Sequence, residues 1–340
     1  MSAQTVYSGP AKVIASVGTG PTLYPLQANG ENGEIKLAIH EERTKRSTAM
    51  HGYVRSTLAD QYAKLTLTPF DSWALLPYLF PPYLGITVGA AGGVLGIGTR
   101  PFDYYADTSG ATHNGTAPVR VFAPDGRLYT LVRHAVTKHP SMKLGVGQAL
   151  FDAIEITGLG DPAKDVGTSA FLMAASPVTE TGATDPDTAG FTPDFINGHW
   201  TGAWGALTGF TAMEVEDYWT LSVDAKYSLL KIQGLTRHAK LDSVEIMIKG
   251  RLAGPTHTQI LAKALAHTLG ATLGEGSATD LILTGPTSKT VTLKDCELIL
   301  EGNGPEFGGT KLGTGEVGFV SKIDFAGTPS VPGPALIFSA

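Results

Sequence analysis

Cysteine is almost absent from this chain of 340 residues, which contains only Cys296. A single cysteine excludes a disulfide within the chain and a zinc site built on several thiolates. Cys296 stands in an apolar run, and in the internal repeat described below it aligns with His134. We therefore interpret Cys296 as a small, half-buried strand residue and not as a reactive thiol.

Charge is also scarce. Charged residues make up 16% of the chain, against about 25% in a typical soluble protein. The 42 glycines exceed the usual share of about 7%. This composition is typical of a chain that buries its surface against copies of itself, and equally of a β-rich monomer with many turns. The net charge of −6 argues against a nucleic-acid-binding surface, which normally carries a basic patch.

Motifs of catalysis, metal binding and membrane insertion are missing. The chain has no His-Glu-x-x-His, Gly-x-Ser-x-Gly or Gly-x-x-x-x-Gly-Lys-Ser/Thr phrase. Residues from Asp185 onward begin like a calcium loop, but Ala189 and Ile196 occupy two of the ligand positions. No apolar run reaches the roughly 18 residues of a membrane span, and the first ten residues do not resemble a secretion signal. We expect a protein made in a cytoplasm, with no cofactor, no metal, no membrane partner and no enzyme activity.

One phrase occurs twice in the chain. Lys143–Phe151 (KLGVGQALF) returns 168 positions later (311 minus 143) as Lys311–Phe319 (KLGTGEVGF), with five of the nine residues identical. Because strand register decides which side chains face a core, the repeat predicts equivalent positions in two copies of one unit. The predicted equivalent structural pairs are Gly145 with Gly313, Gly147 with Gly315, and Phe151 with Phe319.

The flanks of this phrase also correspond. Pro124 and Pro286 each stand in a turn between two apolar runs, which predicts a hairpin in each copy at an offset of 162 (286 minus 124). Asp71–Leu79 and Thr258–Leu269 predict a helix in each copy. The repeat therefore predicts a mainly β fold with two tandem copies of a β-sandwich or barrel domain, each with one flanking α-helix.

Composition sets the domain boundaries. We place the first domain at residues 1–160, a linker rich in Gly, Thr, Pro and Asp at 161–197, the second domain at 198–325, and a Pro-rich C-terminal tail at 326–340. The first copy also has an insertion at 85–117 that the second copy lacks, and this insertion contains many glycines. We interpret this insertion as a flexible loop, because it lacks the glycine order and the βαβ context of a dinucleotide site.

The most charged stretch of the chain is His40–Arg55. It is too polar for a core strand and too long for a tight turn. Either it is a solvated loop, or it is an extended arm that docks on a neighbouring chain. We favour the arm, because charges of both signs suit a polar interface that fixes register. The predicted inter-subunit residues are Glu41, Glu42, Arg43, Lys45, Arg46, His51, Tyr53 and Arg55.

The expected elements follow in the order strand, charged arm, strand, short helix, loop, Pro-turn hairpin, Gly-x-Gly and final strand. Together with Tyr62–Pro69 (YAKLTLTP) and the Trp73-bearing helix after it, this order resembles the major tail tube protein of long-tailed bacteriophages, in a two-domain form. The resemblance implies a structural virion protein that self-assembles into stacked rings, forming a hollow tail tube. It also implies tape-measure and tail-terminator proteins as partners, and phage DNA that passes through the lumen without specific binding. The alternative is a duplicated β-sandwich binding module, such as a virion decoration or carbohydrate-binding protein.

The two-domain form bears on the ring. Most members of the family carry one domain and form six-membered rings. If six domains must surround the lumen and this chain supplies two, three chains close the ring, which is then a trimer with approximate sixfold symmetry; a ring of six chains is the alternative. We also expect a lumen wall poor in Lys and Arg, because a basic wall would bind the phosphates of passing DNA.

Overall fold

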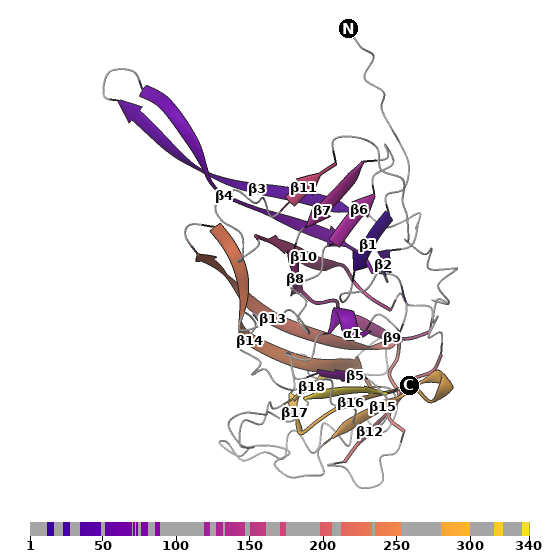
Figure 1. Cartoon of the computed structure of the whole chain (residues 1–340). Coiled ribbons are helices and arrows are strands. Elements are labelled where there is room, and N and C mark those ends of the chain that lie inside the picture. Colours follow the sequence, from indigo (N-terminus) through magenta and orange to yellow (C-terminus); the bar gives the residue numbers. More distant parts are fainter. Residues whose placement is uncertain are drawn as a thin grey trace, which may run out of the picture.

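The computed structural model describes residues 12–16, 23–27, 35–48, 52–69, 71, 73, 76–80, 86–88, 119–122, 127–131, 133–146, 150–160, 171–174, 198–205, 212–232, 235–252, 280–299, 316–321 and 335–339. These residues are mainly β-strands, as the sequence predicts (Figure 1). We call residues 12–174 the first half and residues 198–339 the second half.

Each half contains one long hairpin and several short strands. In the first half the elements are β1 (Lys12–Ser16), β2 (Leu23–Gln27), β3 (Lys36–Thr48), β4 (Gly52–Leu67), α1 (Leu76–Leu79), β5 (Ile86–Val88), β6 (Val119–Phe122), β7 (Leu128–Leu131), β8 (Arg133–Lys138), β9 (Met142–Gly145), β10 (Ile154–Leu159) and β11 (Phe171–Met173). In the second half they are β12 (Thr201–Trp204), β13 (Tyr218–Ile232), β14 (Leu235–Arg251), β15 (Leu281–Thr284), a 3₁₀ turn (Pro286–Ser288), β16 (Thr290–Leu293), β17 (Cys296–Ile299), β18 (Glu316–Ser321) and β19 (Leu336–Ser339).

The strands of the two halves pair in the same order. The first half has the sheets β11-β7-β6-β1-β2 and β3-β4-β10-β8. The second half has β19-β16-β15-β12 and β13-β14-β18-β17, and each of these is extended at one edge by a strand from the first half. The added strands are β5, parallel to β19, and β9, antiparallel to β13. The connection between the halves is therefore made of backbone ladders as well as side chains.

The Pro-turn hairpins have the same register in both halves. Val119 pairs with Leu131 in the first half, and Leu281 pairs with Leu293 in the second. The offset of 162 (281 minus 119) is the one expected from the sequence. Pro286 begins the 3₁₀ turn of the second hairpin, whereas Pro124 lies outside the described residues.

Phe319 and Phe151 are both buried, but they do not occupy equivalent positions. Phe319 lies within β18, between Ile248 of β14 and Leu298 of β17. Phe151 stands before β10 and forms only an isolated bridge with Met142. The expected equivalence of the two phenylalanines is therefore wrong.

The first-half residue that matches Phe319 is Ile156. It lies in β10 between Leu65 of β4 and Val136 of β8. Val136 corresponds to Leu298, the β17 partner of Phe319, because the two differ by the same offset of 162 (298 minus 136) as the hairpins. The sequence alignment is thus displaced by five positions at its end (156 minus 151), because ladder pairing sets the register and a nine-residue similarity does not. Of the four glycines that the repeat pairs, Gly145 ends β9, and Gly147, Gly313 and Gly315 lie outside the described residues.

Two domain boundaries also differ from the prediction. β11 lies inside the predicted linker 161–197 but pairs with β7. β19 lies inside the predicted tail 326–340 but pairs with β16. Both stretches are rich in turn residues, and strands of three or four residues are too short to show an alternating pattern. These two strands hold corresponding places at the sheet edges of the two halves.

The two sheets that contain the long hairpins are joined by one stretch of chain. β8 pairs with β10 on one side, and β9, which follows after residues 139–141, pairs with β13. We call the resulting surface, β3-β4-β10-β8/β9-β13-β14-β18-β17, the joined sheet. Side chains alternate across it, so that Trp219, Leu221 and Val223 of β13 face a core that runs through both halves.

Of the predicted helix Asp71–Leu79, the described α-helical residues are Leu76–Leu79, which form α1. Leu76 and Leu79 are fully buried. Pro77 within this short segment removes a backbone donor, so a longer helix is not favoured. The predicted counterpart Thr258–Leu269 lies outside the described residues.

Candidate assembly surfaces

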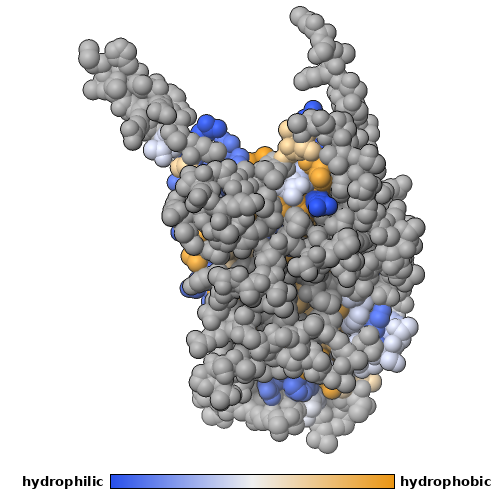
Figure 2. Space-filling model, in the orientation of Figure 1, coloured by the Kyte–Doolittle hydropathy of each residue, from blue (hydrophilic) through white to orange (hydrophobic). Residues whose placement is uncertain are grey.

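The long hairpin β3–β4 projects from the body as a two-stranded ribbon (Figure 1). Its ladder runs from Lys36–Thr66 to Thr48–Gly52 and contains two register shifts, after Glu42 and after Arg46. Such bulges increase the local twist. The charged stretch predicted as an arm is therefore the outer part of this ribbon, and hydrophilic residues are visible where the ribbon leaves the body (Figure 2).

The predicted arm residues differ in their surroundings. Glu41, Glu42 and Arg43 are exposed. Arg43 forms an ion pair of 2.8 Å with Glu41, which also accepts a hydrogen bond from Gln61 Nε2. An exposed pair of this kind stabilises by less than about 1 kcal/mol. In the ladder, Arg46 is paired with Arg55, and Tyr53 with Ser47. Lys45 pairs with Ser56, and His51 lies outside the described residues.

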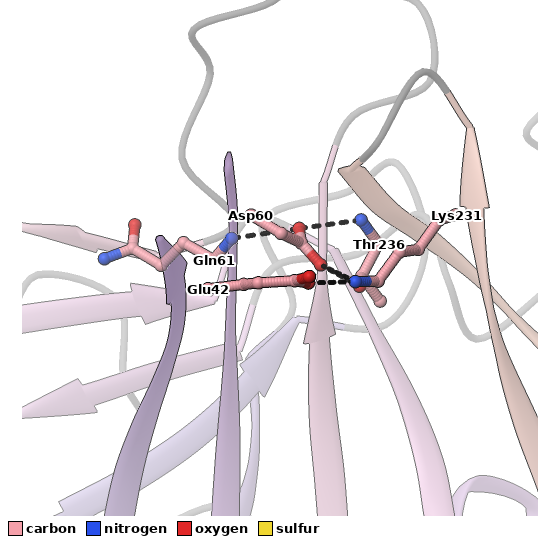
Figure 3. Close-up of polar contacts among 5 residues, drawn as sticks. All are labelled: Glu42, Asp60, Gln61, Lys231 and Thr236. Carbon is pink, nitrogen blue, oxygen red and sulfur yellow. Dashed lines mark hydrogen bonds and ion pairs between the residues drawn. The ribbon is translucent and has the colours of Figure 1, made fainter. Parts of the chain in front are cut away.

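Glu42 points back to the second half rather than away from the molecule. Its carboxylate binds the ammonium group of Lys231, near the end of β13 (Figure 3). The hydrogen bond to Glu42 raises the pKa of Lys231. Lys231 Nζ also lies 3.6 Å from Oδ2 of Asp60 in β4. One of the predicted inter-subunit residues is thus engaged in a contact between the two halves of its own chain.

Hydrogen bonds of Asp60 link the end of the β13–β14 hairpin to β4. Its Oδ1 accepts hydrogen bonds from the backbone N–H groups of Gln61 (2.9 Å) and Thr236 (2.8 Å). Its Oδ2 accepts a hydrogen bond of 2.5 Å from the Thr236 hydroxyl. Asp60 and Thr236 are almost completely buried. A buried carboxylate is tolerated only when it is well hydrogen-bonded, and this cluster meets that condition (Figure 3).

A second polar contact between the halves is centred on His139, in the connection from β8 to β9. Its Nδ1 lies 2.8 Å from the Leu79 carbonyl at the end of α1, and its Nε2 lies 2.6 Å from the hydroxyl of Tyr227 in β13. Burial lowers the pKa of His139 to about 4, so the ring is neutral at pH 7. Because a carbonyl only accepts, Nδ1 carries the proton, and Nε2 accepts from Tyr227.

Aromatic side chains around α1 fill the space between the halves. The ring of Phe338 in β19 lies 5.7 Å from Trp73 and 5.5 Å from Phe80, measured between ring centroids. Trp73 also lies 6.4 Å from Trp200. Aromatic pairs at these separations contribute about 0.5–1.5 kcal/mol beyond their burial. The single turn α1 therefore packs between the halves.

The turn after β9 is anchored to the segment before α1. Oδ1 of Asp71 accepts hydrogen bonds from the N–H groups of Leu150 (2.9 Å) and Phe151 (3.2 Å). Burial raises the pKa of Asp71. These bonds hold β9 and the α1 segment together, so both contact the second half as one unit.

Gly145 allows β9 to approach β13 closely. A Cβ atom placed on Gly145 would lie 2.6 Å from Cβ of Tyr218 and 2.9 Å from the carbonyl oxygen of Asp217. These distances are shorter than van der Waals contact, so a larger residue would push the strands apart. Lys143 Nζ lies 5.6 Å from the centre of the Tyr218 ring, within range of a cation–π interaction.

Sequence reasoning singled out the stretch His40–Arg55 and Gly145 as structurally important but missed Asp60, Thr236, His139 and Tyr227. Asp60 and His139 stand among polar residues in the sequence, and no motif marks them. The only available signal was the position of each beside a predicted strand. Cys296 lies in β17, as expected, but it is completely buried and not half-buried, and burial raises its pKa to about 12.

The described residues contain no cluster of three or more His, Cys, Asp or Glu side chains arranged to hold a metal ion. No helix among them has the length and apolar character needed to cross a bilayer. Comparison with known proteins gives no family assignment, since no protein-family model and no curated protein matches this chain.

Proposed function

We propose that this protein is a structural virion protein that self-assembles into stacked rings and forms the tail tube of a long-tailed bacteriophage. The observation that carries the proposal is the repeated strand order of the two halves. It supports two tandem copies of one β domain joined head to tail, with β9 and β5 of the first copy completing the sheets of the second. A head-to-tail contact generates a closed ring when its rotation closes.

The number of chains follows from the repeat. If one domain takes each of six places around the lumen, three chains form the ring, and phage DNA passes through it. Tape-measure and tail-terminator proteins are the proposed partners within and at the end of the tube. The ribbon β3–β4 supports stacking, because it extends beyond the body and can reach a neighbouring ring (Figure 1).

We propose that the polar face of the joined sheet lines the lumen. On this face Lys64 is neutralised by Glu155 at 2.8 Å. The exposed Lys226 is balanced by Asp224 and Glu245, which face each other across the β13–β14 ladder. A surface with little net positive charge makes few lasting contacts with phosphates, which suits DNA that must slide past.

Electron microscopy of the purified protein, combined with mass measurement of any ring, tests this proposal. We expect hollow rings or filaments, with a ring mass of three chains. A protein that stays monomeric at high concentration and binds a glycan or a capsid surface would support the binding-module alternative and refute the tube. A ring of six chains would refute the trimer only.

A further inference from the structure

The outer part of the β3–β4 ribbon carries charge of one sign. Residues 43–59 contain no aspartate or glutamate. Their four cations are Arg43, Lys45, Arg46 and Arg55. The whole chain has a net charge of −6, so the rest of it sums to −10 (−6 minus +4). The ribbon is therefore a basic arm on an otherwise acidic protein.

Both acidic residues at the base of the ribbon have partners within the chain. Glu41 forms an ion pair of 2.8 Å with Arg43, and the carboxylate of Glu42 binds Lys231 of the second half (Figure 3). The first of these contacts compensates one of the four cations, Arg43. The other three positive charges stand further out along the ladder.

Two of these outer cations are direct ladder partners. Arg46 pairs with Arg55 in the β3–β4 ribbon. Like charges directly opposite each other destabilise a pair of strands, whereas a negatively charged surface placed against them offsets the repulsion. The outer ribbon therefore suits an acidic partner.

An acidic surface precedes β13. Glu214, Glu216 and Asp217 are all exposed, and residues 212–220 contain no lysine or arginine. We call these three residues the acidic edge. Val146 lies beside them, since it follows Gly145, the ladder partner of Tyr218, and it is 66% exposed. An apolar residue surrounded by polar ones is the usual arrangement in a protein interface.

Nearby cations do not cancel the charge of the acidic edge. Arg251 lies 3.7 Å from Glu216, and His199 lies 3.6 Å from Glu214. Lys143, which lies over the ring of Tyr218, is 3.9 Å from the additional carboxylate of Asp152. These groups comprise four carboxylates against two permanent cations and one imidazole. Negative charge is therefore in excess whether or not the imidazole is protonated.

The basic ribbon and the acidic edge lie at opposite ends of the joined sheet. The outer ends of both long hairpins point to one side of the molecule, and β9, which pairs with the start of β13, lies on the other (Figure 1). β13 has 15 residues, which corresponds to roughly 50 Å along the strand. The ribbon beyond Glu42 is only about 20 Å long. It therefore does not reach the acidic edge of its own chain.

We infer that the basic ribbon of one copy docks on the acidic edge of another copy. Complementary surfaces at opposite ends of one chain form a head-to-tail contact, which continues without limit where its rotation does not close. This inference rests on the proposed tube and identifies the contact that stacks its rings. DNA is the other polyanion that suits a basic arm. A second copy accounts for both the ribbon and the acidic edge, whereas DNA accounts for the ribbon alone.

Charge reversal on each side tests the contact. The ribbon variant carries Arg46→Glu and Arg55→Glu, and the edge variant carries Glu214→Lys and Asp217→Lys. Each variant alone should form rings that do not stack into filaments in electron microscopy, because like charges then meet. A chain with all four substitutions should stack again, because the attraction returns with its signs exchanged.

Charge-conserving variants are the matched controls. Arg46→Lys with Arg55→Lys, and Glu214→Asp with Asp217→Glu, should stack like the wild-type chain. Melting temperatures, which should be unchanged in every variant, separate loss of the contact from loss of the fold. Wild-type filaments should also shorten at high salt, because the Debye length falls from about 10 Å at 0.1 M to about 3 Å at 1 M.

The possible outcomes separate this contact from the tube itself. Normal filaments from the ribbon variant would refute the contact and leave the tube standing. Failure of the four substitutions to restore stacking that each pair abolishes would also overturn the contact. DNA binding that the ribbon variant loses while its rings still stack would assign the ribbon to DNA. Chains whose association in sedimentation follows the charge reversals, but which form no rings or tubes, would refute the tube and leave the contact standing.

Discussion

The hydroxyl of Tyr227 donates a hydrogen bond to Nε2 of His139 across the boundary between the two halves, at 2.6 Å. The imidazole in this arrangement is neutral, because burial disfavours the charged ring, and protonation of Nε2 would make the Tyr227 hydroxyl accept instead of donate. His139 is 4% exposed, and burial lowers its pKa from 6.5 to about 4. The contact between the halves is therefore sensitive to acid.

We predict that the free energy of unfolding falls as the pH decreases from about 6.5 to about 4. In this window the unfolded chain binds a proton at His139 and the folded chain does not, so the stabilisation is complete above the window and lost within it. A pKa lowered by about 2.5 units corresponds to about 3 kcal/mol. Urea unfolding at a series of pH values measures the loss, and it should be smaller by that amount in His139→Gln, whose side chain does not titrate.

The second prediction concerns Asp60. Asp60→Ala removes the acceptor for two backbone N–H groups and for the Thr236 hydroxyl. Because these donors are largely buried, we expect a loss of about 2–4 kcal/mol in the free energy of unfolding. The matched control is Glu42→Gln, which weakens the exposed ion pair with Lys231 and should cost much less, because solvent screens an exposed pair. Equal losses in the two variants would contradict the central role of Asp60.

The third prediction concerns the ribbon. Deletion of residues 44–50 should leave the melting temperature of the isolated chain nearly unchanged, because the β3–β4 ribbon projects from the body (Figure 1). Rings should still form but should no longer stack, and electron microscopy would show single rings in place of filaments. A variant in which a Gly-Ser sequence of the same length replaces residues 44–50 keeps the length of the ribbon and removes its charges, so it tests whether the charges are needed for stacking. Filaments of normal length from the deletion variant would show that the ribbon does not stack rings.

The fourth prediction concerns Cys296. Burial raises the pKa of its thiol to about 12, so only about one molecule in 10,000 carries the reactive thiolate at pH 8. The folded chain should resist alkylation at this pH, and labelling should begin only in denaturant. Labelling of the native protein at the rate of a free thiol would show that β17 opens readily.

The sequence predicts the parts of the fold that depend on local patterns. The Pro-turn hairpin around Pro286 has the expected register, because turn residues fix the pairing of the strands that they connect. The stretch His40–Arg55 is predicted as a solvated loop or an extended arm, and its described residues pair in the β3–β4 ladder. Its sequence is mostly polar, so no apolar alternation reveals the strands.

The contacts between the halves could not be predicted. Thr236 lies 176 positions from Asp60, and Tyr227 lies 88 positions from His139. The pairing of β9 with β13 is equally remote from any local pattern. Such contacts depend on how two completed units pack, and a repeat in the sequence shows that two units exist without showing how they meet.

The pairing of β5 with β19 has a consequence for the growing chain. Leu336 lies 250 positions after Ile86 (336 minus 86), yet the two residues are ladder partners. At roughly 5–20 residues per second on the ribosome, β5 waits on the order of 10 to 50 seconds for its partner. During this time Trp73 and Phe80, which Phe338 contacts in the finished protein, lack that cover. Neighbouring nascent chains can therefore associate through these exposed side chains before translation ends. A low density of ribosomes on each mRNA should reduce this association and increase the yield of native protein.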